Sequence, residues 1–385
     1  MKFLHMSDLH IGKVVNGFSM IAEQKHVFEQ IIAYIKIENP DAVVIAGDIY
    51  DRAIAPVEAV RVFDDFLTNL AGENVAVIII SGNHDSPERI NYASRLLSEQ
   101  HIFFYGAFDG SIHKVAMHDE YGEVVFWLLP FIKPADASFI QEGEEIDSYD
   151  SYNDVIGAAL RAADIDYNVR NVLVSHQFYT KAGFTAVLSD SERNPIGGLD
   201  AVDAGIIERF DYVALGHLHG RQSVGEKHIC YSGSPVKYSL SEWRQKKSAN
   251  LVELGEKGDL KIKALPLVPL HDMREIKGEI DKLMSDEISS LADKEDYIYA
   301  IFTDEDEVID PMIKLRSVYP NIMGCRPENL RISIDISDAA MDMEAIENLS
   351  DYELFSEFFL YVKGREMSER QIEIVRGLLK GADAE

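Results

Sequence analysis

Five short clusters of the sequence combine histidine, aspartate and asparagine in a way that could bind divalent metal ions. They are Ser7-Asp8-Leu9-His10, Gly47-Asp48-Ile49-Tyr50-Asp51, Gly82-Asn83-His84-Asp85, Ser175-His176-Gln177 and Gly216-His217-Leu218-His219. Imidazole, carboxylate and amide groups without a thiolate suit manganese or iron better than a closed zinc site. Two such ions about 4 Å apart can activate a water molecule and brace the leaving oxygen of a phosphodiester. The clusters therefore indicate metal-dependent hydrolysis of phosphate esters.

Each cluster by itself is weak evidence for a metal site. An aspartate after a glycine, such as Asp48, is more often a turn residue or a helix cap, and Asn83-His84-Asp85 after Gly82 is also compatible with a turn. The pair His217 and His219 is stronger, because alternate side chains of an extended segment face the same way. The occurrence of all five clusters in one chain favours a shared site over five separate turns.

Each cluster follows an apolar run almost immediately, and these runs have the length and composition of buried strands. The runs occupy residues 3–6, 42–46, 75–80, 124–129, 172–174, 212–215 and 228–231. Residues 20–37 repeat apolar side chains at helical spacing, and Pro56 opens a second helix that extends to about Leu70. This alternation predicts an α/β fold. Because ligands of open α/β sheets gather beyond the carboxyl ends of the strands, the five clusters should converge on one edge.

The charge of the chain argues against a nucleic-acid ligand, although the composition is that of an ordinary folded protein. The 385 residues include 46% hydrophobic and 27% charged residues, and the formal net charge is −29. Residues 201–270 contain ten Lys or Arg against eight Asp or Glu, whereas residues 271–349 contain eight against twenty. A basic stretch of Arg244, Lys246 and Lys247 lies in the net-positive segment. It indicates either a phosphate contact or, more simply, a solvated loop.

Several features of the sequence limit where the protein acts and which residues belong to its site. No segment approaches the length of a membrane span, and the amino terminus lacks a secretory signal, so we expect a cytoplasmic protein without membrane contact. Cys230 and Cys325 are far apart and are interpreted as reduced thiols. The remaining histidines have no motif around them and are left out of the candidate site: His5, His26, His101, His113, His118, His228 and His271.

The five motifs together resemble those of the calcineurin-like metallophosphoesterases. The shared pattern is Asp8-x-His10, Gly47-Asp48-x-x-Asp51, Gly82-Asn83-His84-Asp85, His176 and Gly216-His217-x-His219. Residues 48–56, the segment Tyr231-Ser-Gly-Ser-Pro235, and then Tyr238 and Glu242 narrow the resemblance to bacterial nucleases of this superfamily that process DNA double-strand ends. The resemblance implies an α/β fold with two packed β-sheets flanked by helices.

The same resemblance assigns metal ligands to positions of this sequence. One divalent ion would be held by Asp8, His10 and His219. A second would be held by Asn83, His176 and His217, and Asp48 would bridge the two. The two ions are expected to be Mn²⁺.

The resemblance also assigns catalytic residues. His84 would stay free of metal and act on the phosphate or on the leaving 3′ oxygen, and Asp85 would orient its ring. A turn cap remains an equal alternative for Asp85. Asp51 and Arg52 are given no metal and could instead contact the substrate.

The chain beyond about residue 265 is expected to form separate parts, because the ligand set is complete and the composition turns acidic. Residues 296–302 and 330–336 are strand-like and residues 311–319 are helix-like, which indicates a small α/β lobe. Residues 352–362 and 368–379 predict two amphipathic helices. The expected division is a nuclease domain at 1–265, a capping domain at 266–345 that helps to position DNA, and a helical partner-binding tail at 346–385.

The tail could dock on its own body or on another protein, and we favour the partner. Phe355, Phe358, Phe359 and Tyr361 form an aromatic group that is too large to be exposed singly on a free tail. The resemblance supplies the partner, a coiled-coil ATPase that gates access of DNA and binds residues 350–385. It also implies a homodimer. Both would bring the positive surface that this acidic chain lacks.

We therefore expect a manganese-dependent DNA nuclease that acts on double-strand ends and hairpins. It would be a 3′ to 5′ exonuclease on duplex ends and an endonuclease at hairpins or single strands. One alternative is another phosphatase or phosphodiesterase of the same superfamily, which would give no reason for the capping lobe and the aromatic tail. Another is a non-catalytic scaffold that keeps the fold, but burying unneeded His and Asp side chains together would cost stability.

Overall fold

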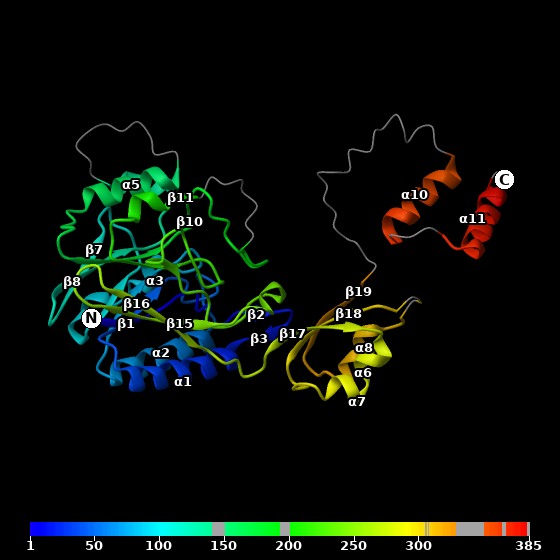
Figure 1. The fold of residues 1–385 in the computed structure, drawn as a ribbon, viewed down its shortest axis with the longest axis horizontal. Coiled ribbons are helices and arrows are strands. Elements are labelled where there is room, and N and C mark those ends of the chain that lie inside the picture. Colours follow the sequence, from blue (N-terminus) through cyan, green and yellow to red (C-terminus); the bar gives the residue numbers. More distant parts are fainter. Residues whose placement is uncertain are drawn as a thin grey trace. The chain divides into compact units, whose positions relative to one another are not determined.

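The computed structural model describes residues 1–140, 151–192, 201–304, 306, 308–328, 350–363 and 367–382. The chain divides into two compact units, Met1–Met273 and Arg274–Glu385, whose elements are labelled in Figure 1. Among the described residues, no helix is both long and apolar enough to cross a membrane.

The first sheet of the Met1–Met273 unit has six strands in the order β16-β15-β1-β4-β5-β6. Four of them, β1, β4, β5 and β6, are parallel, and two antiparallel strands from much later in the sequence complete one edge. Leu4 of the first strand thus lies opposite Leu251. The strands are β1 (Lys2–Met6), β4 (Ala42–Ala46), β5 (Ala76–Ile80), β6 (Ile102–Tyr105), β15 (Ser248–Leu254) and β16 (Leu260–Pro266).

The second sheet of this unit also has six strands, in the order β13-β14-β12-β9-β8-β7. Its middle strands are parallel, and an antiparallel strand closes each edge. The strands are β7 (His113–Asp119), β8 (Gly122–Leu129), β9 (Arg170–His176), β12 (Tyr212–Gly216), β13 (Gln222–Ser223) and β14 (Ile229–Tyr231).

The two sheets pack face to face, and helices cover their outer faces. Both sheets contribute to the core between them, where the rings of Phe3 and Phe126 meet edge to face at 5.3 Å. Helices α1 (Ile21–Glu38) and α2 (Val57–Gly72) lie along the outer side of the first sheet, and α5 (Tyr152–Ala162) covers the second (Figure 1). The predicted fold class, two packed sheets flanked by helices, is confirmed.

Short elements decorate this body, mostly at the ends of the longer strands and helices. They are β2 (Val14–Val15), β3 (Phe18–Ser19), α3 (Pro87–Ile90), α4 (Ser94–Leu97), β10 (Tyr179–Thr180), β11 (Val202–Asp203) and the 3₁₀ turns Ser98–Gln100, Pro134–Phe139, Ala204–Ile207 and Leu240–Glu242.

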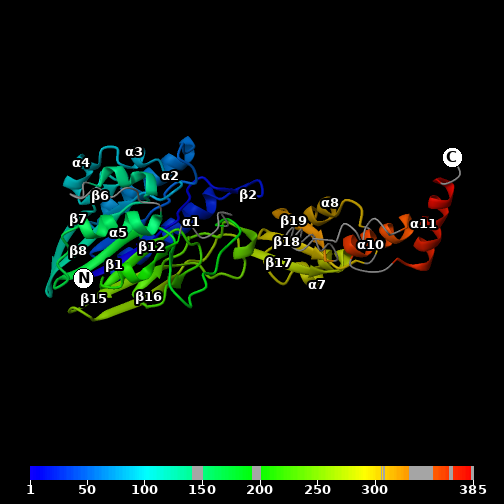
Figure 2. The same cartoon turned by 90° about the horizontal axis from the view of Figure 1, so that it is seen from above.

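The Arg274–Glu385 unit contains a small sheet and a pair of C-terminal helices. The sheet order is β17-β18-β19, and Ile298, Leu315 and Tyr319 belong to its own small core. Helices α10 and α11 lie side by side (Figures 1 and 2). The elements are β17 (Met273–Gly278), α6 (Ile280–Met284), α7 (Asp286–Ser289), β18 (Tyr297–Phe302), α8 (Pro311–Arg316), β19 (Ile322–Pro327), α10 (Asp351–Lys363) and α11 (Glu369–Ala382).

The strands predicted before residue 232 are present, but among the longer strands the sequence did not predict β6, β7, β15, β16, β17 or β19. The predicted strand at 330–336 lies outside the described residues. The division proposed from the sequence at residues 265 and 345 stays a prediction. The helical prediction for 352–362 and 368–379 matches α10 and α11 closely.

Candidate active site

The loops that leave β1 and β4 run beside each other and bring two carboxylates together. The backbone amides of Asp8 and His10 donate to the carbonyls of Gly47 and Asp48, both at 3.0 Å, and Ile11 continues the ladder in the same direction. Parallel strands pair in register up to this point, so both loops leave the sheet at the same edge. The first two clusters of the sequence therefore converge because their strands are neighbours.

Three residues of these loops adopt left-handed backbone conformations that are uncommon for side chains other than glycine. The φ angles are 54° at Asp8, 42° at His10 and 53° at Asp48. Each such residue costs of order 1 kcal/mol and persists where the surrounding structure holds it. The inter-loop hydrogen bonds supply that support, and the turns aim the side chains across the edge of the sheet.

Two glycines allow the third and fourth clusters to approach this edge. A Cβ on Gly47 would lie 2.4 Å from the Nδ1 atom of His176, and a Cβ on Gly82 would lie 2.1 Å from Oδ1 of Asp48. Both distances are far below van der Waals contact. Glycine at these positions is therefore required for the loops to close around the site.

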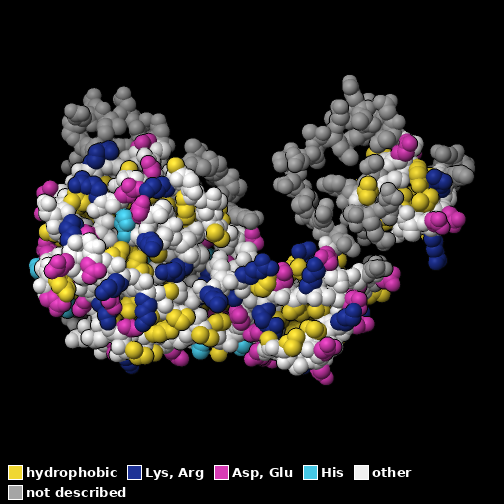
Figure 3. All heavy atoms as spheres, viewed as in Figure 1, with side chains coloured by type: hydrophobic (Ala, Val, Ile, Leu, Met, Phe, Trp, Pro, Cys, Tyr) yellow, Lys and Arg dark blue, Asp and Glu magenta, His cyan; other side chains and the backbone are white. Residues whose placement is uncertain are grey.

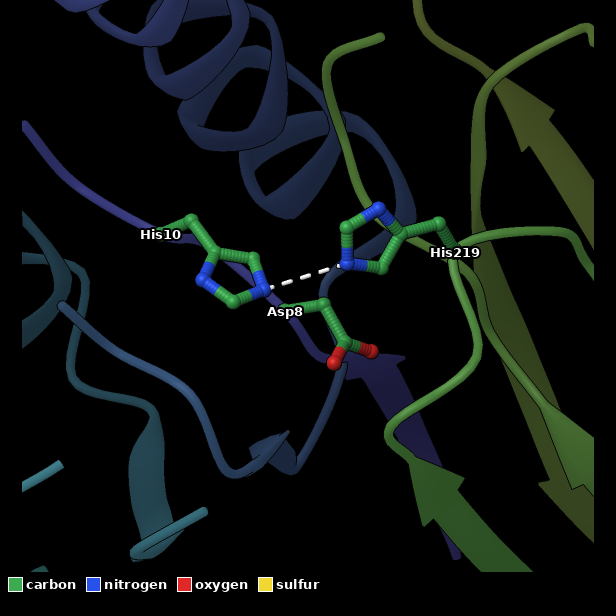
Figure 4. A group of neighbouring side chains, drawn as sticks. All are labelled: Asp8, His10 and His219. Carbon is green, nitrogen blue, oxygen red and sulfur yellow. Dashed lines mark hydrogen bonds between the residues drawn. The ribbon is translucent and has the colours of Figure 1, made fainter. Parts of the chain in front are cut away.

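The first group of candidate ligands is Asp8, His10 and His219, all of them buried (Figure 4). The Nε2 atoms of His10 and His219 face each other at 3.1 Å. Two ring nitrogens that are each about 2.1 Å from one shared ion lie roughly 3 Å apart when they bind at a right angle. The observed spacing therefore fits a cation held between the two rings.

The second group is Asn83, His176 and His217. The amide oxygen of Asn83 is 3.1 Å from Nε2 of His176 and 3.1 Å from Nδ1 of His217. Asp48 lies between the two groups, because its Oδ2 atom is 3.5 Å from Nε2 of His10 and 3.4 Å from Nε2 of His176. The structure thus brings together all seven residues that the sequence proposed as metal ligands.

The charges of this cluster show that the buried carboxylates require nearby positive charge. Burial raises the pKa of Asp8 to about 6, even though His176 and His219 oppose the shift. Burial would also raise the pKa of Asp48, but His176, His10 and His84 together outweigh this effect and hold that pKa far below its usual range. Burial acts to lower the pKa of His176, yet Asp48 raises it to about 9. A divalent ion fits this need for positive charge, as does the chemistry of the ligand set.

His84 is positioned at both its backbone and its ring. Its amide donates to Oδ1 of Asp48 at 2.8 Å, and its Nδ1 atom is 2.9 Å from the carbonyl oxygen of Asp51. Because a carbonyl only accepts, Nδ1 carries the proton in this contact. The Nε2 atom is then the ring nitrogen that can accept or give a proton.

The contacts of Asp85 do not match the orienting role that the resemblance suggested. Its carboxylate accepts from the backbone amides of Ile49, Tyr50 and Gly82 at 2.9 to 3.1 Å, whereas the ring of His84 is oriented by Asp51. Burial, followed by the charge of Asp48, raises the pKa of Asp85 to about 7. The alternative left open by the sequence, a cap of the turn, is the one that these contacts favour. Asp85 ties the Asp48 loop to the Asn83 loop.

A cavity of about 430 Å³ opens over the two ligand groups. Lys13, Lys133, Phe131 and Tyr152 line it together with His84. The two lysines were not predicted from the sequence, although Lys13 follows the first cluster by three residues and could have been found from that position. Its Nζ atom is 2.7 Å from Oδ1 of Asp51. Figure 3 shows Lys and Arg side chains spread over one face of this unit among the acidic ones.

The basic stretch in the net-positive segment is only partly on the surface. Arg244 and Lys246 are exposed, as expected for a solvated loop. Lys247 is buried, and its Nζ atom is 2.6 Å from Oε2 of Glu242. Lys247 is therefore engaged inside the protein rather than available to a phosphate.

Comparison with known proteins shows which family this chain belongs to. Residues 1–221 match the calcineurin-like phosphoesterase family, and residues 269–362 match the type 5 capsule protein repressor C-terminal domain. The SbcD subunit of nuclease SbcCD from Staphylococcus epidermidis is 30% identical over 383 residues, with 98% of both chains covered. The protein of the same name from Staphylococcus saprophyticus is 29% identical over 381 residues, again with 98% of both chains. The crystal structure of TT1561 from Thermus thermophilus gives a TM-score of 0.40 at 15% identity, over 68% of this chain and 98% of that chain.

The family match covers more than half of the chain and includes all five strand-end clusters, so this protein belongs to the calcineurin-like phosphoesterases. It is a metal-dependent phosphodiester hydrolase. Within that class the chain belongs to the SbcD family of nucleases, to whose members it is similar along almost its whole length. The family and the enzyme class expected from the sequence are confirmed.

Proposed function

We propose that this protein is a manganese-dependent DNA nuclease that acts on double-strand ends as a 3′ to 5′ exonuclease and on hairpins or single strands as an endonuclease. The observation that carries the proposal is the position of Asp48 between two groups of nitrogen and oxygen ligands beneath an open cavity. The relatives are named as subunits of the nuclease SbcCD, and these names support the substrate.

In this proposal Asp8, His10 and His219 hold one ion, Asn83, His176 and His217 hold the other, and Asp48 bridges them. The absence of thiolate among these groups favours Mn²⁺ over a structural zinc ion. Divalent ions bound there would supply positive charge to the phosphodiester and generate the nucleophile from water.

His84 would act as a general acid that gives a proton to the leaving 3′ oxygen as its bond to phosphorus breaks. The contact between its Nδ1 and the Asp51 carbonyl fixes the ring so that Nε2 can donate a proton when the imidazole is charged. Asp85 contributes indirectly, since it holds the loops of Asp48 and Asn83 in place.

The cavity provides local positive charge, although the net charge of the whole chain is negative. Lys13 and Lys133 are at its wall, and the metal ions would add positive charge where the phosphate enters. The overall charge of −29 still predicts weak binding of DNA away from the site. We infer that an SbcC-type coiled-coil ATPase, bound through residues 350–385, provides additional DNA-binding surface.

We also propose a homodimer. The start of α2 exposes Val57 and Val60, three residues apart on one face of the helix, next to the exposed Ile54, with side chains 68%, 46% and 74% exposed respectively. Such apolar groups favour contact with another protein surface. Light scattering of the purified chain should give twice its mass of 43.3 kDa, whereas a value for one chain would contradict the dimer.

The proposed activity is tested by comparing three substrates in Mn²⁺: a blunt duplex labelled at either end, a DNA hairpin and a phosphomonoester. We expect shortening from the 3′ ends of the duplex, opening of the hairpin and negligible turnover of the monoester. Efficient monoester hydrolysis without cutting of either DNA, even with the ATPase added, would instead indicate a phosphatase of the same fold. No turnover of any substrate by metal-loaded protein would favour a scaffold.

A further inference from the structure

The ring of His219 is held on the side that faces away from His10. Its Nδ1 atom is 3.1 Å from Oε1 of Glu242, whose side chain is completely buried. The hydroxyl of Ser191 is also 3.1 Å from this Nδ1 atom. Since a carboxylate accepts and does not donate, Nδ1–H points to Glu242. The lone pair of Nε2 is then directed toward His10 and the proposed ion.

Glu242 is itself anchored by a buried lysine. The Nζ atom of Lys247 is 2.6 Å from Oε2 of Glu242, 2.9 Å from the carbonyl oxygen of His219 and 2.9 Å from Oγ of Ser234. One ammonium group therefore restrains both the backbone of His219 and the carboxylate that holds its ring. A buried ion pair is tolerated when its remaining hydrogen-bonding groups are satisfied in this way.

The second ligand group has no comparable charged support among the described contacts. The Nδ1 atom of His176 is 2.7 Å from the backbone carbonyl oxygen of Ala46, which is neutral. A carboxylate behind a ligating imidazole increases the basicity of the ring and fixes its orientation. The two halves of the candidate site are thus supported by different chemistry.

We propose that Glu242, anchored by Lys247, is a positioning residue that strengthens metal binding by His219, so that the ion at Asp8 and His10 is held more tightly than the ion at His176. The proposal rests on the assignment of His219 as a metal ligand in the proposed function. It gives a role to two residues that the sequence singled out without one, Glu242 as a family marker and Lys247 as part of a basic stretch.

The alternative is that Glu242 and Lys247 form an ion pair that only stabilises the fold. Measurements of metal affinity distinguish this alternative from the positioning role of Glu242. Calorimetric titration of the metal-free full chain with Mn²⁺ should show two binding events in the wild type. In Glu242→Gln we expect roughly a 10- to 100-fold loss of affinity in the tighter event, with the weaker event nearly unchanged. The matched control is Glu23→Gln, because Glu23 is also buried and lies 2.8 Å from a histidine, His271, outside the site.

Removing Glu242 alone leaves the charge of Lys247 buried without a partner, which could unfold the protein. The double variant Glu242→Gln/Lys247→Met removes both charges and should keep the fold while showing the same selective loss of affinity. Thermal unfolding in EDTA checks the fold of each variant.

Each result of the titration decides a different point. Equal loss in both binding events, or wild-type affinities in the folded double variant, would overturn the positioning role and leave the nuclease proposal intact. Failure of the wild-type chain to bind Mn²⁺ at all would overturn the metal site itself.

Discussion

The loops at the strand ends and the C-terminal helices hold their functional side chains in opposite ways. In the loops, each candidate ligand is buried or packed against a neighbour from a distant part of the chain, as His176 is against Asn83. In α10 and α11, large apolar side chains are exposed: Leu354, Phe355, Phe358, Leu360, Ile374 and Leu378. The contact of Arg376 with the ring of Tyr352, at 4.6 Å, joins the two helices.

This difference separates two kinds of function. The loops are preorganised by the fold, so their chemistry requires only ions and substrate. The helices present apolar surface that water solvates poorly, and we propose that this surface binds another molecule. Changes in the loops should therefore alter catalysis in the isolated chain, and changes in the helices should alter assembly alone.

The largest expected effect comes from Asp48→Asn. The carboxylate of Asp48 lies within 3.5 Å of both His10 and His176. Loss of its charge should weaken the binding of both ions, and DNA cleavage should fall by at least about 1000-fold. Elemental analysis of the dialysed protein should show reduced manganese content.

A matched control for this variant is Asp109→Asn. Asp109 also pairs with a histidine, His113 at 3.0 Å, but it does so on the surface away from the cavity. The control should keep its activity and metal content. Normal cleavage by Asp48→Asn would remove the bridging role of that residue.

His84→Ala should reduce cleavage by about 10²- to 10⁴-fold while metal content stays that of the wild type, because general-acid residues contribute in this range. The measurement is kcat/KM on duplex DNA together with bound manganese. His113→Ala is the control. The alternative is that His84 binds a metal ion, since one of its ring nitrogens lies within 4.8 Å of the ligand atoms of His10 and Asp48. Loss of manganese along with activity would show that His84 is a ligand.

The interior beneath the loops makes stability depend on pH through His5. This residue joins the two sheets, because its Nδ1 atom is 2.8 Å from the hydroxyl of Tyr212 and its Nε2 atom is 3.2 Å from the carbonyl oxygen of Leu215. Burial lowers the pKa of His5 to about 3. The unfolded chain takes up the proton near pH 6.5 and the folded protein does not, so stability is lost as the pH falls from 6.5 toward 3.

Between pH 7 and pH 5, this single group should lower the free energy of unfolding by about 2 kcal/mol. Urea denaturation of the metal-free protein at the two pH values measures the loss. His5→Gln, whose amide can replace both hydrogen bonds, should lose about 2 kcal/mol less than the wild type over the same interval. His118→Gln is an exposed control and should show the wild-type difference. The same pH dependence in His5→Gln and wild type would show that His5 does not cause this loss of stability.

The site could be predicted from the sequence to the extent that it follows strand ends. Asp8, Asp48, Asn83, His176 and His217 each come within three residues of a predicted strand, and parallel neighbours bring such residues to one edge. The types of ligand and their order along the chain were therefore sufficient to propose the metal site.

The supporting contacts could not be predicted, because they depend on segments that meet only in three dimensions. Lys247 belongs to a basic stretch by sequence, yet it is buried against Glu242. Asp85 follows His84 directly, yet its carboxylate turns toward the backbone of another loop. The pairing of β1 with β15 likewise joins residues from opposite ends of the body. Spacing along the chain carries no information on such contacts.

The smallest effect on the isolated chain should come from the helices. Phe358 is 60% exposed and its ring lies 6.5 Å from that of Phe355, so the two form an apolar anchor on α10. Phe358→Asp should weaken association with an SbcC-type ATPase by about 1–2 kcal/mol, or roughly 5- to 30-fold, because aromatic anchors dominate such interfaces. Because Phe358 packs little in the free chain, cleavage of a single-stranded substrate without ATPase should remain at the wild-type rate.

The matched control is Ile37→Asp, which places the same charge at a residue of α1 that is 75% exposed. Biolayer interferometry with immobilised ATPase measures both variants, and the control should bind as the wild type does. Equal weakening by the two variants would mean that added negative charge, not the loss of an anchor, opposes association. Wild-type binding by Phe358→Asp would place the partner surface outside this aromatic pair, and the exposed side chains of α11, Ile374 and Leu378, would be the next to substitute.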